Sequence, residues 1–201
     1  MNKLFDFFKK NSTDIIKPTA VLLAICVIIP LALSLTNKIT VKKIASLEEE
    51  NSKKAMASLI KADDFRTVTA SDTEYYKAVK DGETVGYIFK TSAKGYGGDI
   101  SVMTAVNPDG TVKSVAILDV SNETPGLGQN AAKESFYSQY AGKKKGVSLL
   151  KNGAESEKNE VDAVTGATIT STAVNRAVNE ALDEFEKLSG NTNTAEVTDG
   201  E

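Results

Sequence analysis

The fold is decided by residues 75–120, which read YYKAVKDGETVGYIFKTSAKGYGGDISVMTAVNPDGTVKSVAILDV. Asp81-Gly82 and Pro108-Asp109-Gly110 are turn signals that separate runs rich in β-branched and aromatic residues. These runs are Tyr75–Val79, Thr84–Thr91, Asp99–Val106 and Thr111–Val120. Strand-like runs joined by short turns predict an antiparallel meander.

Two segments that follow the strand-like runs have helical patterns, one near Asn130–Tyr140 and one from about Ile169 to Leu188. The second repeats apolar residues at helical spacing, namely Val174, Val178, Ala181, Leu182, Phe185 and Leu188. Such helices would cover one face of the sheet. The sequence therefore predicts the α+β class, an antiparallel β-sheet packed by helices.

A stretch without charge, residues 19–35, lies between Lys17 and Lys38. At ~1.5 Å per residue, a helix of this length spans roughly 26 Å, close to the ~30 Å of a bilayer core. We therefore expect one N-terminal transmembrane helix over residues 19–36, in which Pro30 is tolerated. A cleaved signal peptide is the alternative, but the long polar segment before the stretch and its length favour an uncleaved anchor.

The rest of the chain divides by composition around this span. We expect residues 1–18 to be a cytoplasmic N-terminal segment, 37–62 a helical stalk, 63–188 a globular domain and 189–201 a polar, acidic and disordered tail. Lysines 3, 9, 10 and 17 suit a cytoplasmic N-terminus, whereas lysines 38, 42 and 43 weaken that assignment. Charge alone leaves the orientation open.

The composition excludes several functions. A net charge of −3 with no basic stripe makes nucleic acid an unsuitable partner. The chain has no histidine and one cysteine, Cys26, so the usual ligand sets for zinc, iron–sulfur clusters and haem are absent. Ser-His-Asp and Cys-His nucleophiles are excluded for the same reason. We predict no metal site and no catalytic side chain, so any redox centre must be an organic cofactor.

Residues 162–171, which read DAVTGATITS, join a glycine turn rich in hydroxyl groups to the start of the predicted C-terminal helix. Backbone N–H groups and the helix dipole favour a phosphate at such a point. The hydroxyl groups of Thr165, Thr168 or Thr170 could instead simply cap the helix. Taken alone, the motif leaves both interpretations open.

Two upstream loops could approach a flat ligand. Residues 123–128, ETPGLG, form a tight turn with a bare backbone after the last predicted strand, or an ordinary exposed loop. Residues 95–100, GYGGDI, form a glycine-rich turn in which Tyr96 either packs near a cofactor or belongs to a plain hairpin.

These motifs closely resemble those of the FMN-binding subunits of two related redox pumps. They are the G subunit of the Rnf-type ferredoxin:NAD+ oxidoreductase complex and the C subunit of the sodium-pumping NADH:quinone reductase. The resemblance implies an FMN-binding domain in which Thr168 carries FMN through a phosphoester, while a flavin transferase that installs FMN from FAD reads Asp162. It also implies cofactor binding by Thr165, Gly166, Ala167, Glu123, Thr124, Gly126 and Leu127. Many relatives have a histidine where this chain has Ser121-Asn122, so an imidazole near the flavin is not expected.

By this resemblance the chain is an electron-transfer subunit of an Rnf-type ion-translocating complex and is not catalytic alone. Its partners would be membrane and iron–sulfur subunits. The resemblance implies a single-pass protein of the cell membrane with a cytoplasmic N-terminus and an extracytoplasmic domain. The alternatives are the C subunit of the quinone reductase, a stand-alone flavoprotein that reduces extracellular acceptors, and a non-redox membrane-anchored binding module.

Overall fold

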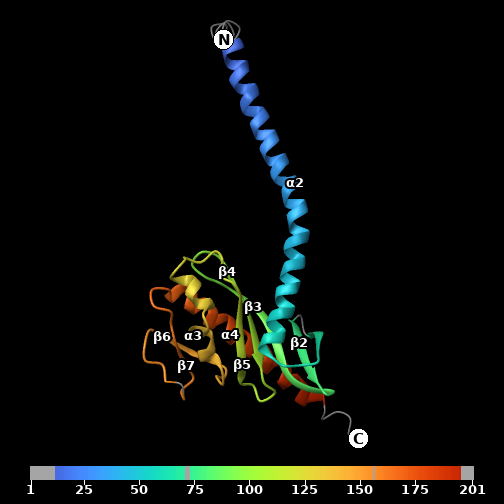
Figure 1. The fold of residues 1–201 in the computed structure, drawn as a ribbon, viewed down its shortest axis with the longest axis vertical. Helices are drawn as coiled ribbons and strands as arrows, with labels where there is room; N and C mark the ends of the chain where they lie inside the picture. The colour runs from blue at the N-terminus through green and yellow to red at the C-terminus, as the bar shows by residue number, and fades with distance from the viewer. Residues whose placement is uncertain (1–11, 71–72, 156, 196–201) are drawn as a thin grey trace. The chain divides into compact units, whose positions relative to one another are not determined.

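The computed structural model describes residues 12–70, 73–155 and 157–195, and the chain divides into two compact units, Met1–Glu50 and Asn51–Glu201 (Figure 1). The helices and strands follow the order α2 (Ser12–Leu59), β1 (Asp64–Ala70), β2 (Thr73–Lys80), β3 (Glu83–Lys94), β4 (Asp99–Val106), β5 (Val112–Asp119), η1 (Gly128–Ala132), α3 (Glu134–Tyr137), η2 (Ser138–Tyr140), β6 (Ser148–Leu150), β7 (Glu160–Asp162) and α4 (Thr168–Ala195). Here η1 and η2 are short 3-10 helices.

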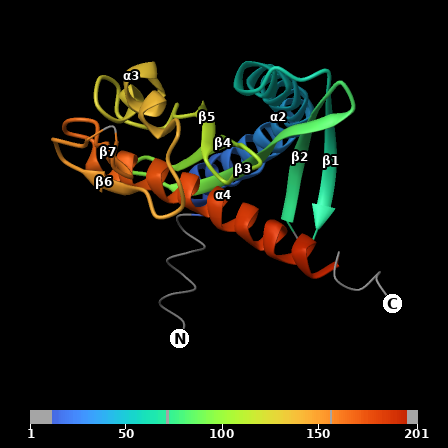
Figure 2. The same ribbon diagram turned by 90° about the horizontal axis from the view of Figure 1, so that it is seen from below.

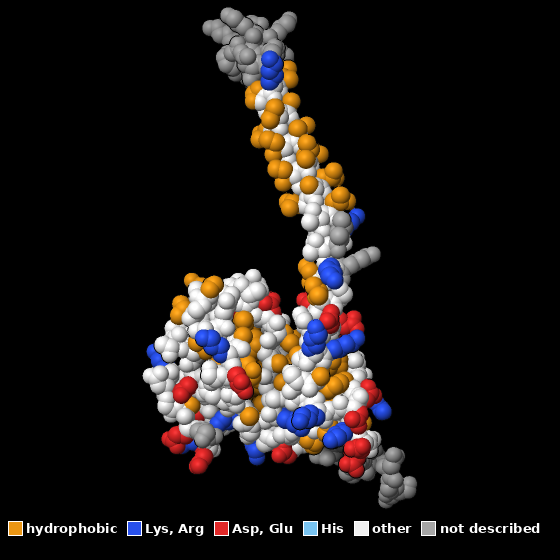
Figure 3. Space-filling view, viewed as in Figure 1, with side chains coloured by type: hydrophobic (Ala, Val, Ile, Leu, Met, Phe, Trp, Pro, Cys, Tyr) orange, Lys and Arg blue, Asp and Glu red, His pale blue; other side chains and the backbone are white. Residues whose placement is uncertain are grey.

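The described part of the first unit lies within α2. Its segment Ile16–Lys38 is long and apolar enough to cross a membrane, and it contains the predicted span 19–36. Hydrophobic side chains cover this segment in Figure 3, and its large apolar residues are exposed, for example Leu22 and Leu31. A helix that is apolar all round is typical of a membrane span. The segment therefore has the character of a membrane anchor.

The second unit is built on a five-stranded antiparallel sheet in the order β1-β2-β3-β4-β5. The predicted meander is confirmed as β2 to β5, with β1 added at one edge. Lys80 pairs with Glu83 across the hairpin between β2 and β3. The two residues between them, Asp81 and Gly82, have φ values of 52° and 86°. Positive φ at both positions is the pattern of a type I′ turn, whose twist matches the paired strands.

Both faces of the sheet are covered. Neighbouring residues of a strand point to opposite faces, so one strand contributes side chains to two cores. Phe89 lies in the core beneath α4, which runs across the sheet in Figure 2. Its neighbour Ile88 packs in a second core with Met103 and Ala105 from β4 and Met56, Leu59 and Ile60 from the end of α2 and the residue after it. The sequence predicts helices on one face of the sheet only, whereas the end of α2 packs on the second face.

The domain also begins earlier than predicted. Residues 37–62 are predicted to form a stalk and residue 63 to begin the domain, whereas the compact unit begins at Asn51. The physical reason is the burial of Met56, Leu59 and Ile60, which are 6%, 6% and 1% exposed. The last turns of α2 thus belong to the domain.

The other helices also differ in detail from the prediction. The helix expected near Asn130–Tyr140 is three short helical segments, and Lys133 in extended conformation separates the first two. Helix α4 continues through residues 189–195, where disorder was expected, because extending an existing helix costs little. The remaining tail residues, 196–201, lie outside the described residues. The short parallel pair of β6 and β7 was not predicted.

Replacing Ile60 by alanine should destabilise the second unit by roughly 2–5 kcal/mol, the usual cost of truncating a buried isoleucine. The side chain is 1% exposed and packs closely against Gly86. Tyrosine fluorescence during urea unfolding measures this unit alone, because all six tyrosines lie in it and the chain has no tryptophan. Leu47→Ala is the control, because Leu47 is 44% exposed. Equal effects of the two changes would contradict this assignment of the domain boundary.

Candidate functional site

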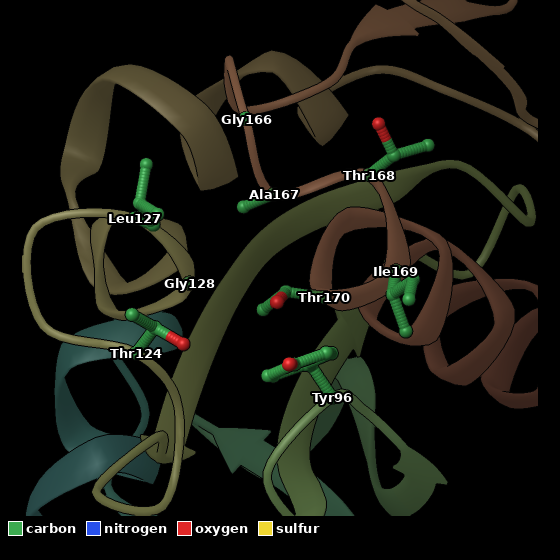
Figure 4. A pocket seen from close by; sticks show the side chains of 9 residues that line it. All are labelled: Tyr96, Thr124, Leu127, Gly128, Gly166, Ala167, Thr168, Ile169 and Thr170. Carbon is green, nitrogen blue, oxygen red and sulfur yellow. The ribbon is translucent and has the colours of Figure 1, made fainter.

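A pocket of about 510 Å³ lies where three separate segments of the second unit meet (Figure 4). The segments are the loop after β3, the loop after β5 and the start of α4. Leu127 and Thr124 lie on one side of the view, and Thr168 and Ile169 on the other. The lining residues are Tyr96, Thr124, Leu127, Gly128, Gly166, Ala167, Thr168, Ile169 and Thr170. All three sequence motifs therefore contribute to one pocket.

A tight turn leads into α4. The Ala167 N–H donates to the Val164 carbonyl over 3.0 Å, and Gly166 has a φ of 76° at the third position of this turn. Only glycine adopts such a value at little cost, as a type II turn requires. The Ser171 N–H donates to the Ala167 carbonyl over 2.9 Å, which makes Ala167 the N-cap residue of the helix.

The start of α4 is not capped by a threonine side chain. Alanine at the N-cap has no side-chain acceptor, and within the described parts of the chain no acceptor is found for the N–H groups of Thr168, Ile169 and Thr170. These donors and the positive end of the helix dipole suit a phosphate. Among the described residues no Lys or Arg lines the pocket, so backbone N–H groups are its means of holding an anion.

The hydroxyl groups of the motif lie in different surroundings. Thr168 is exposed, and no hydrogen bond of its Oγ1 is found among the described residues. Thr170 is 2% exposed and donates to Glu123 over 2.5 Å. Ser171 accepts from the Val164 N–H over 2.9 Å and donates to the Ala167 carbonyl over 3.0 Å. Within the described part of the 162–171 motif, Thr168 is thus the threonine that lines the pocket with an unengaged hydroxyl.

Large apolar side chains surround the same pocket. Tyr96, Leu127 and Ile169 are 71%, 44% and 55% exposed. Outside α2, no other large hydrophobic residue of the described chain is exposed. Exposed apolar side chains gathered around a pocket mark a ligand site. With N–H donors at the helix start, the pocket fits a ligand that has a flat apolar part and a phosphate, as FMN does.

Three residues predicted to bind the cofactor, Glu123, Gly126 and Thr165, do not belong to the described lining of the pocket. Glu123 is 3% exposed, and its carboxylate accepts from the Gly97 N–H and the Thr170 hydroxyl. Gly126 has a φ of 77° in a turn closed by the Leu127 N–H, which donates to the Thr124 carbonyl over 3.1 Å. Gly126 therefore shapes the loop that presents Thr124 and Leu127.

Asp162 and Thr165 line a separate cavity of about 310 Å³. The carboxylate of Asp162 accepts from the Ala154 N–H over 2.9 Å, and its own N–H donates to Gln139 Oε1 over 2.8 Å. These contacts order the strand that enters the 164–167 turn. The structure thus separates these two residues from the pocket that contains Thr168.

Three residues that line the pocket are not among the predicted cofactor-binding residues, namely Gly128, Ile169 and Thr170. Ile169 is a large apolar residue at the start of α4, and in the structure it is 55% exposed beside the pocket. The contact between Thr170 and Glu123 joins positions 47 residues apart, which no local pattern indicates. Tyr96 lines the pocket and also belongs to the hairpin loop between β3 and β4.

Comparisons with known proteins agree with this geometry. Residues 95–183 match the family model of the FMN-binding domain. The chain is 33% identical over 189 residues to the G subunit of the Na(+)-translocating ferredoxin:NAD(+) oxidoreductase complex of Acetobacterium woodii, covering 84% of this chain and 90% of that protein. It is 41% identical over 129 residues to the G subunit of the proton-translocating ferredoxin:NAD(+) oxidoreductase complex of Clostridium ljungdahlii, covering 64% of this chain and 68% of that protein.

A solved structure has a similar fold. The C subunit of the Na(+)-translocating NADH-quinone reductase of Parabacteroides distasonis matches with a TM-score of 0.50 and 28% identity, over 57% of this chain and 61% of that one. The fold and the pocket thus define an FMN-binding domain. The chain belongs to the family of G subunits of the ion-translocating ferredoxin:NAD+ oxidoreductase complexes. The family predicted from the sequence and the α+β fold class are confirmed.

Proposed function

We propose that this chain is the membrane-anchored flavoprotein subunit of an ion-translocating ferredoxin:NAD+ oxidoreductase complex, with FMN attached to Thr168 through a phosphoester. The observation that carries the proposal is the exposed Thr168 hydroxyl at a helix start whose N–H groups lack acceptors within the described chain. When bound, FMN supplies the redox chemistry. The chain supplies its position and surroundings and is not catalytic alone.

Each part of the pocket has a role in this proposal. The N–H groups of Thr168, Ile169 and Thr170 hold the phosphate, and the apolar residues Tyr96 and Leu127 lie against the ring and exclude water. Thr168 is the residue of attachment, because the Thr170 hydroxyl is engaged with Glu123 and Thr165 lines another cavity. Thr124 offers a hydroxyl to the polar edge of the ligand.

The proposed covalent bond has a physical reason. A helix N-terminus stabilises a nearby anion by only ~0.3–1 kcal/mol at an exposed site. Even a micromolar flavin site, worth ~8 kcal/mol, would lose its ligand by dilution outside the cell. A phosphoester prevents this loss. In the proposal, a flavin transferase installs FMN from FAD and reads Asp162.

The proposed topology is that of a single-pass membrane protein. Residues 1–18 are cytoplasmic, the helix within Ile16–Lys38 crosses the cell membrane, and the FMN domain is extracytoplasmic, with a polar tail at its end. The partners are the other membrane and iron–sulfur subunits of the complex. The C subunit of a sodium-translocating NADH:quinone reductase is the second candidate, supported by the likeness to the P. distasonis protein.

The full chain produced with a flavin transferase should carry one covalent FMN. Intact-mass measurement should show the added flavin phosphate, in-gel fluorescence should show the flavin, and peptide mapping should assign it to Thr168. The flavin transferase is omitted as a control, and that protein should be colourless. A colourless protein under loading conditions would favour the non-redox binding module, and an adduct on another residue would refute the site.

A further inference from the structure

Glu123 is a buried carboxylate beneath the pocket. Its Oε1 accepts from the Gly97 N–H over 2.9 Å, and its Oε2 accepts from the Thr170 hydroxyl over 2.5 Å. Among the described residues no Lys or Arg pairs with it. A buried carboxylate without a cation depends on its hydrogen-bond donors. Here the donors come from two of the segments that line the pocket, and Glu123 itself belongs to the third.

The neighbouring glycines lie close around this carboxylate. A Cβ added at Gly95 would lie 2.5 Å from Glu123 Oε1, and one added at Gly128 would lie 2.6 Å from Oε2 and 2.8 Å from Thr170 Oγ1. Atoms do not approach so closely without displacement, so both positions require glycine while the carboxylate stays where it is. The loop after β3, the loop after β5 and the start of α4 are therefore packed on a single side chain.

We propose that Glu123 is a positioning residue that assembles the FMN pocket before the flavin is attached. Through Thr170 it fixes the first turn of α4, and so the Thr168 hydroxyl and the N–H donors beside it. Through Gly97 it fixes the loop that bears Tyr96. Glu123 itself does not line the pocket. The inference rests on the proposed function.

The role is one of geometry, and the glutamine variant tests it. In Glu123→Gln the amide oxygen can accept from the Gly97 N–H, and the amide nitrogen can donate to the Thr170 hydroxyl, which rotates to accept. Glu123→Gln should therefore carry FMN to within about twofold of the wild type, whereas Glu123→Ala, which loses both contacts, should carry about tenfold less.

The test uses the full chain produced with a flavin transferase, and the measured quantity is the flavin-bearing fraction of folded protein by intact mass. Glu184→Ala is the matched control. Glu184 accepts from the Thr73 hydroxyl over 2.6 Å, and it does not line the FMN pocket. This variant should load as well as the wild type. Circular dichroism of the flavin absorption bands reports whether the loaded ring is held rigidly, and this signal should weaken only in Glu123→Ala.

Gly128→Ala gives a second, independent variant, because its Cβ would displace the carboxylate, and it should lose flavin as Glu123→Ala does. Full loading of a folded Glu123→Ala or Gly128→Ala protein would overturn the inference. Loading of Glu123→Gln as poor as that of Glu123→Ala would also overturn it, since charge would then be the cause. Titration of the unmodified chains with free FMN, followed by flavin fluorescence, reports on the pocket even if Thr168 proves not to be the attachment residue.

Discussion

Thr168→Val is expected to abolish covalent flavin and to leave the fold unchanged. Thr168 is exposed, and none of the described residues accepts from or donates to its hydroxyl, so valine removes the nucleophile and no structural contact. Surface changes of this kind usually alter the free energy of unfolding by no more than about 0.5 kcal/mol. Intact mass and in-gel fluorescence should show no adduct, while tyrosine fluorescence during urea unfolding should match the wild type.

Thr172→Val is the matched control for this loss. Its hydroxyl is also exposed and lies one turn further along α4, where it donates to the Thr168 carbonyl over 2.8 Å. This variant should keep its flavin. Thr168→Ser, which restores a hydroxyl at the same position, should recover at least part of the loading. A flavin adduct that persists in Thr168→Val would show that another hydroxyl carries it.

The fold was predictable where the pattern is local. Strands β2 to β5 contain many β-branched and aromatic residues, and Asp81-Gly82 marks the hairpin turn between two of them. Strand β1 was missed because it has few apolar residues, and these serve different cores. Phe65 packs with the core that includes the end of α2, whereas Val68 packs with the core beneath α4. Because the apolar residues of β1 are divided between its two faces, the strand lacks the apolar/polar alternation that identifies a strand in a sequence.

The functional site shows the same difference between features that are local in the sequence and features that are not. The turn at Gly166 and the helix that follows are close in sequence, so the glycine turn leading into a helix start could be predicted. The role of Glu123 could not, because its contacts reach residues 26 and 47 positions away. From its place in the loop, Glu123 is predicted to bind the cofactor. In the structure it is 3% exposed and accepts from Gly97 and Thr170.

A second large effect is expected from Gly97→Ala, which should separate the two loops beside the pocket. A Cβ at this position would lie 1.8 Å from the Asn122 carbonyl oxygen and 2.7 Å from its carbonyl carbon. Both atoms belong to the backbone, so no side-chain rotation relieves the overlap. Overpacking of this kind typically costs roughly 1–3 kcal/mol. The displaced loop also carries Tyr96, and so loading with FMN should fall together with stability.

Gly98→Ala separates this overlap from the general effect of adding a methyl group to the loop. Its Cβ would lie 3.1 Å from both Cβ and Nδ2 of Asn122. The amide group can rotate away, and the contact with Asn122 Cβ requires a far smaller displacement than the 1.8 Å overlap at Gly97. We therefore expect near-wild-type stability and flavin content for Gly98→Ala, and losses of both for Gly97→Ala, by urea unfolding and intact mass. If Gly97→Ala loaded fully, the close approach of the two loops would not be needed to form the pocket. The flavin would then depend on the start of α4 alone.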